Sequence, residues 1–154
     1  MKRHKDLEVW KKSISLISSI YTATTDFPAS EVYGITNQIR RSAVSIPSNI
    51  AEGSVRQGNK EFVQFLYISL GSLAELETQL IIARNLDCLL LKDYESLIAN
   101  LVYIRKMLLG LIIHKEKVVK SHHSLLITHN PQPITHNPSY NESTKKIFKT
   151  ILLA

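Results

Sequence analysis

The chain has 154 residues, of which 44% are hydrophobic and 21% are charged, a balance typical of one soluble globular domain with its own core. A net charge of +6 favours polyanionic partners, and the single cysteine, Cys88, excludes an intrachain disulfide. No apolar run reaches the length of a membrane span, and the basic N-terminus lacks the apolar stretch of a signal peptide, so we expect a cytoplasmic protein.

The first expected helix covers residues 6–25. Large apolar side chains recur along it at alternating spacings of three and four, which predicts one buried stripe: Leu7, Trp10, Ile14, Ile17 and Tyr21. The helix should end before Pro28, because the residue that precedes a proline avoids helical geometry.

The second expected helix begins near Ser30, a good N-cap, and ends between Gly53 and Gly58. Its apolar stripe crosses Pro47 without losing phase: Ile35, Ile39, Ala43, Ile46 and Ile50. Proline removes one backbone hydrogen bond and crowds the preceding turn. The continuous stripe therefore predicts a helix that is kinked at Pro47 but not broken.

The third and fourth helices are expected at residues 60–85 and 93–117, with Asn59 and Asp93 as caps. One stripe of the third helix comprises Phe62, Leu66, Ser69, Leu73, Leu76, Leu80 and Ala83. The stripe of the fourth comprises Tyr94, Leu97, Leu101, Ile104, Leu108 and Leu111. Short connections between long helices force antiparallel neighbours. The fold class is thus all-α, an up-down-up-down four-helix bundle.

A second apolar stripe on the third helix predicts a contact between subunits, because a lone bundle buries only one face of each helix. On the second helix, Arg41, Ser45, Ser48 and Glu52 share a face of mostly short side chains that would let a neighbour approach. The alternative is an ordinary solvated face. The candidate interface residues are Ser45, Ser48, Glu52, Tyr67, Leu70 and Ala74.

After Val118 the composition becomes polar, and the pentapeptide ITHNP occurs twice, at Ile127 to Pro131 and at Ile134 to Pro138. Such a segment buries little apolar surface. We therefore predict a bundle at residues 1–118 and a flexible, disordered tail at 119–154.

Three segments resemble the 23S rRNA intervening-sequence protein family of four-helix bundles: DLEVWKKS at Asp6, QIRRSAVSIPSNIAEG at Gln38 and GSLAELETQL at Gly71. The resemblance covers roughly residues 5 to 117. It implies a homo-oligomeric ring, with a pentamer as the expected state, and no established activity. Similar bundle proteins serve as accessory factors to reverse transcriptases.

Catalytic motifs are absent from the sequence: there is no Glu-x-x-His pair for a di-metal site, no P-loop and no Gly-x-Ser-x-Gly elbow. We therefore expect no enzyme activity, no metal and no cofactor. Basic residues are the remaining signal, and the candidate nucleic-acid ligands are Arg40, Arg41, Arg56, Lys60, Lys11 and Lys12. These favour an oligomer that binds RNA or DNA without sequence preference. The alternative is a protein-interaction scaffold or accessory subunit without direct nucleic-acid contact.

Overall fold

The computed structural model describes residues 4–31 and 33–129, with side chains described as far as residue 121. The chain divides into two compact units, Met1–His122 and His123–Ala154, and the observations below concern the first. The predictions made for residues from 130 onward, including most of the repeated pentapeptides, lie outside the described residues.

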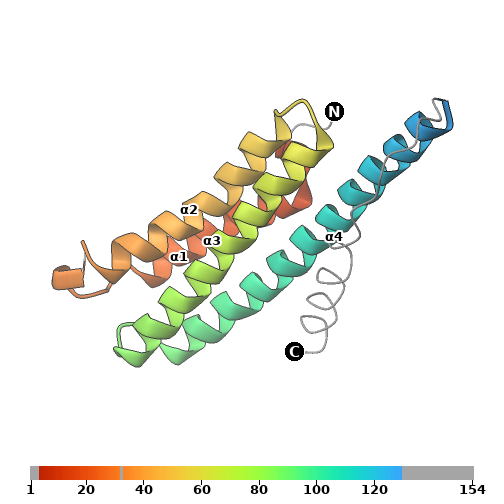
Figure 1. Cartoon of the computed structure of the whole chain (residues 1–154). Coiled ribbons are helices and arrows are strands. Elements are labelled where there is room, and N and C mark those ends of the chain that lie inside the picture. Colours follow the sequence, from red (N-terminus) through yellow and green to blue (C-terminus); the bar gives the residue numbers. More distant parts are fainter. Residues whose placement is uncertain (1–3, 32, 130–154) are drawn as a thin grey trace, which may run out of the picture. The chain divides into compact units, whose positions relative to one another are not determined.

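Four α-helices make up the described chain (Figure 1): α1 at Glu8–Ala23, α2 at Ile35–Ser54, α3 at Asn59–Asn85 and α4 at Leu91–His129. Short 3-10 turns, η1 at His4–Asp6 and η2 at Ala29–Glu31, precede α1 and α2. The described residues contain no strand. The predicted all-α class is confirmed.

Side-chain contacts show that consecutive helices run in opposite directions. Between α2 and α3, Ser42 contacts Gln79, whereas Ser45, further along α2, contacts Ser72, earlier in α3. Between α3 and α4, an ion pair joins Glu77 to Arg105, whereas Asn59, at the start of α3, accepts a hydrogen bond from Lys115 at 3.2 Å. This is the predicted antiparallel bundle.

The core is built from one apolar stripe on each helix. On α2 and α3 it is the predicted stripe: Ile39, Ala43, Ile46 and Ile50 are fully buried, and so are Leu66, Leu73, Leu76 and Leu80. Leu97, Leu101, Ile104 and Leu108 supply the α4 side. The helix α2 continues through Pro47, which is itself buried. The prediction of an unbroken helix is confirmed.

The stripe predicted for α1 is right only in part, because Leu7, Trp10 and Ile17 pack against the core while Ile14 and Tyr21 do not. The structure buries Val9, Ser13, Leu16 and Ile20, whereas Ile14 and Tyr21 are 40% and 45% exposed. The buried set also has helical spacing but includes a serine, whose hydroxyl donates to the Val9 carbonyl at 2.8 Å and so needs no other partner. The larger apolar side chains lie beside the core or face outward.

Several predicted helix ends also need correction. Ser30 lies in η2, and α2 begins only at Ile35, whose backbone N–H is capped at 3.2 Å by the Glu31 carboxylate. Asn59 and Asp93 lie inside the first turns of α3 and α4 rather than capping them. The helix α4 continues past the predicted end at Lys117 to His129.

Small and polar residues fill the contact between α2 and α3. We call this set the polar seam: Ser42, Ser45, Asn49, Ser69, Ser72 and Gln79. The buried hydroxyl of Ser42 donates to Gln79 Oε1 at 2.6 Å, and the hydroxyls of Ser45 and Ser72 lie 2.9 Å apart. The Ser69 hydroxyl donates to the Ile46 carbonyl at 3.1 Å. Short side chains allow the two helices to approach closely.

Two segments, Asn59–Asn85 and Leu91–Ser121, have the length and mean hydropathy of a membrane span. The criterion is weak, because core helices of soluble proteins also meet it. Both segments place leucines in the core shared with α1 and α2. Packing between helices therefore accounts for part of their apolar character, and other apolar side chains of both helices, such as Ile68 and Ile113, are exposed.

Candidate nucleic-acid and assembly surfaces

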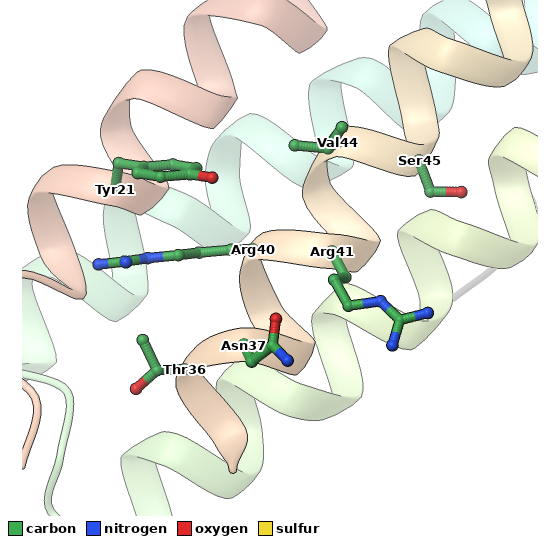
Figure 2. Close-up of a pocket in the computed structure, with 7 residues that line it drawn as sticks. All are labelled: Tyr21, Thr36, Asn37, Arg40, Arg41, Val44 and Ser45. Atoms are coloured by element: carbon green, nitrogen blue, oxygen red, sulfur yellow. The ribbon is translucent and has the colours of Figure 1, made fainter. Parts of the chain in front are cut away.

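The adjacent arginines of α2 point to opposite sides of the helix (Figure 2). Arg40 reaches α1, where its Nε donates to Thr24 Oγ1 at 2.9 Å and its Nη2 donates to the Thr24 carbonyl at 3.2 Å. Its guanidinium carbon lies 4.6 Å from the centre of the Tyr21 ring. Arg40 therefore has a structural role between α1 and α2, in addition to any role toward a ligand.

Arg41 extends toward α3 and is exposed. No hydrogen bond or ion pair joins its guanidinium to another residue in the described part of the chain. Five N–H donors in a planar fork are therefore free, in the arrangement that suits a phosphate group. Of the two arginines of α2 that were predicted to bind nucleic acid, Arg41 is the one whose guanidinium is available to a phosphate.

A hollow of about 470 Å³ lies along the outer side of α2, lined by Tyr21, Thr36, Asn37, Arg40, Arg41, Val44 and Ser45 (Figure 2). Thr36 is only 3% exposed, and its hydroxyl has no hydrogen-bond partner among the described residues. The two cations give the hollow a positive rim. It is open and shallow, so a flexible chain suits it better than a small enclosed ligand.

The other predicted basic residues differ in how far they are engaged within the subunit. Arg56, in the turn after α2, pairs with Glu52 of α2, and its guanidinium lies 4.9 Å from the Phe65 ring centre. Lys11 pairs with Glu8 at 2.7 Å, and this hydrogen bond lowers the pKa of Glu8 and raises the pKa of Lys11. Lys12 and Lys60 are exposed. The structure does not bring these residues together with Arg41 in one patch.

The predicted interface residues divide into two groups. Ser48 is exposed and donates only to the Val44 carbonyl of its own helix, and Glu52 and Ala74 are exposed too. Ser45 instead belongs to the polar seam, where it is partly buried against Ser72. Ser45 is therefore in contact with α3 within the subunit, and it also lines the open hollow on α2.

Tyr67 and Leu70, the remaining predicted interface residues, lie on α3. Leu70 is partly buried against the core, whereas Tyr67 is 40% exposed. The Tyr67 hydroxyl hydrogen-bonds to Glu116 of α4 at 3.3 Å. Desolvation, together with the charge of Glu116, raises the pKa of Tyr67. Tyr67 is thus tied to α4 while keeping an accessible ring edge.

The fold places three basic side chains against aromatic rings. The pairs are Tyr21 with Arg40, Phe65 with Arg56, and Phe62 with Lys115. The first pair joins α1 to α2, the second joins the turn after α2 to α3, and the third joins α3 to α4. The residues of a pair lie far apart in the sequence, so no local pattern could have indicated them. Tyr21 was instead predicted to be a core residue.

Among the described residues, no group of three or more histidine, cysteine, aspartate or glutamate side chains is arranged to hold a metal ion. Cys88 is partly buried, and its thiol lies 3.6 Å from the carbonyl of Leu86. The described helices therefore present cationic and apolar surfaces rather than a recognisable catalytic cluster.

Residues 5–110 match the family model described as 23S rRNA-intervening sequence protein. The chain belongs to this family. No curated protein matches the chain. A solved structure from Bacteroides thetaiotaomicron, described as a protein of unknown function from the S23 ribosomal protein family, is 27% identical with a TM-score of 0.61. The match covers 68% of this chain and 97% of that one.

Within this member of the 23S rRNA-intervening sequence family, the segment from Pro47 to Gly53 ends at a close contact between α2 and α3. Pro47 and Gly53 are both buried. A Cβ atom on Gly53 would lie 2.5 Å from the Phe65 Cβ and 2.8 Å from the Phe62 Cδ2. The segment that carries the family resemblance therefore serves packing between helices, and the hollow around Arg41 lies further toward the start of α2.

Proposed function

We propose that the protein is a non-enzymatic homo-oligomer, a pentameric ring, that binds nucleic acid through its basic surface without sequence preference. The observation that carries the proposal is Arg41, an exposed arginine without a partner in the described structure, on the rim of a hollow that it shares with Arg40. A net charge of +6 adds a general attraction for polyanions.

Assembly is supported by the large apolar side chains that the single subunit leaves exposed. On α3 these include Tyr67, Ile68, Ile81 and Ile82, and on α4 they include Val102, Tyr103 and Ile113, each between 37% and 52% exposed. Where such side chains form a contiguous patch, they mark an interaction site. A ring would present one Arg41 per subunit. Several weak phosphate contacts would then act together on one nucleic-acid chain and raise its overall affinity.

A non-enzymatic, cytoplasmic role agrees with the side chains at hand. Cys88, the one thiol, has the Leu86 carbonyl as its hydrogen-bond partner, with no histidine or lysine among those partners to activate it as a nucleophile. A chain with a single cysteine also suits a reducing compartment. No metal or cofactor is required by the proposed binding.

The test is binding of fluorescent RNA and DNA strands, followed by anisotropy from about 50 mM salt upward. Affinity should fall with salt at a slope of roughly −0.7 per neutralised phosphate for single strands. Arg41→Glu should weaken binding to every sequence and flatten the slope. Lys106→Glu, the same charge change at an exposed position on α4, is the control and should have a smaller effect. Absence of binding by the wild type at low salt would refute nucleic-acid binding.

A protein-interaction scaffold, such as an accessory subunit of a larger enzyme, is the second candidate. It is favoured by the engagement of Arg40, Arg56 and Lys11 within the subunit, which leaves fewer cations for phosphates. The same exposed apolar side chains would then contact a different protein. An assembled protein that binds no nucleic acid would favour this candidate.

A further inference from the structure

The Tyr21 ring is held in place on the rim of the hollow by Arg40. The guanidinium lies along one side of the ring, and two hydrogen bonds to Thr24 fix the guanidinium itself. Figure 2 shows this parallel arrangement, with none of the other labelled side chains over the opposite side of the ring. Tyr21 is nevertheless 45% exposed, so much of the aromatic surface remains accessible.

An exposed aromatic ring with a fixed orientation is a suitable surface for stacking a nucleic-acid base. Every base has a π face, so stacking on a tyrosine tolerates any sequence. A ring that is already ordered loses less conformational entropy when a base stacks on it. Bases in a duplex are already stacked and paired, so only unpaired strands can use such a surface without an unstacking cost.

Arg41 and Asn37 supply the polar side of the same hollow. They lie one helical turn apart on α2, and both are exposed. Arg41 can bind a phosphate through its free N–H groups, and the Asn37 amide can donate or accept a hydrogen bond. The hollow thus combines an aromatic face with a free cation, which is the pairing used by proteins that bind single strands.

We propose that the hollow binds single-stranded nucleic acid, with one base stacked on Tyr21 and a neighbouring phosphate on Arg41. This inference rests on the proposed nucleic-acid function and adds a preference for unpaired strands. Arg40 acts as a positioning residue, since it orients the ring and contributes positive charge without needing to touch the base.

The experiment compares two probes with the full chain: an oligothymidylate of about twelve nucleotides and an abasic strand of equal length and charge. The wild type should bind the thymidylate roughly 5- to 150-fold more tightly, the range of stacking on one aromatic side chain. Tyr21→Leu should bring this ratio close to one, and Tyr21→Phe should preserve it. Tyr33→Leu, at a tyrosine that is 91% exposed, is the control and should leave it unchanged.

Arg41→Gln should weaken binding of both probes by the same factor, because it removes a phosphate contact and leaves the stacking surface intact. Helical content and mass are measured for every variant. Equal wild-type affinity for the two probes, or a Tyr21→Leu variant that keeps the wild-type ratio, would overturn the stacking site and leave general nucleic-acid binding standing. Failure of the wild type to bind any strand would overturn both proposals.

Discussion

Arg40 of α2 donates two hydrogen bonds to a single residue, Thr24 at the C-cap of α1, through its Nε to the hydroxyl and its Nη2 to the carbonyl. The bond to the carbonyl satisfies a backbone acceptor close to the end of α1, where helical partners run out. The residue next to Arg40 in the sequence, Arg41, has no comparable partner in the described structure. Two identical neighbours therefore have different roles.

This difference predicts opposite results for two alanine substitutions. Arg40→Ala should destabilise the protein by about 1–3 kcal/mol, because it removes hydrogen bonds from a charged donor and the cation over Tyr21. Arg41→Ala should change stability by less than about 0.5 kcal/mol. Urea unfolding at one fixed protein concentration measures both. Equal losses for the two variants would show that Arg41 has a partner in the assembled protein.

Ser48 and Ser45 give a matched test of assembly. Ser48→Arg places a long charged side chain on an exposed position, so it should lower the mass seen by light scattering and preserve helical content. Ser45→Arg should instead destabilise the subunit, because it breaks the contact with Ser72 inside the polar seam.

The control for both variants is Ser15→Arg, at an exposed position on α1 outside the candidate interface. It should change neither mass nor helical content. A wild-type mass close to 17.5 kDa, that of one chain, would contradict homo-oligomerisation. An unchanged mass for Ser48→Arg would place the subunit contact elsewhere.

Two glycines in helices should respond to alanine in opposite ways. Gly53→Ala should cost about 1–3 kcal/mol, because the new methyl group would overlap Phe65 and Phe62. Gly71→Ala should stabilise α3 by about 0.5–1 kcal/mol, since nothing lies within 4 Å of its added Cβ. Thermal unfolding at equal protein concentration gives the comparison. A destabilised Gly71→Ala variant would indicate that another subunit packs there.

Stability at high pH should depend on Tyr67. Burial and the nearby Glu116 raise its pKa above the ordinary value of 10.0, so the folded protein retains the phenolic proton at pH values where the unfolded chain has lost it. The folded state then binds more protons, and its stability falls as pH rises above about 10. Tyr67→Phe should flatten that fall, whereas Tyr33→Phe should not. Equal pH dependence in the three proteins would contradict this assignment.

The stripe of α2 was predictable because helical periodicity allowed one choice of buried face. On α3, which carries two apolar stripes, the stripe that includes Leu66, Leu73 and Leu80 is the one that the structure buries. On α1 two sets have helical spacing, and the sequence favours the set with Trp10 and Tyr21 over the one with Ser13. Which of the two faces of α1 is buried depends on how the neighbouring helices pack against it. The same holds for the site: Arg40 and Arg41 look equivalent until Thr24 and Tyr21, from another helix, are placed beside one of them.

The polar seam also limits how α2 and α3 can be aligned along their axes. Leucines and isoleucines would pack acceptably after a shift of one turn, because apolar contacts have little directionality. Such a shift would break the hydrogen bonds from Ser42 to Gln79 and from Ser69 to the Ile46 carbonyl, while both hydroxyls keep a carbonyl partner on their own helix. Each hydrogen bond lost between the helices costs about 0.5–1.5 kcal/mol. A redesigned bundle with alanines throughout the polar seam should therefore adopt several axial registers of α2 against α3. In each register Arg41 would lie beside a different part of α3.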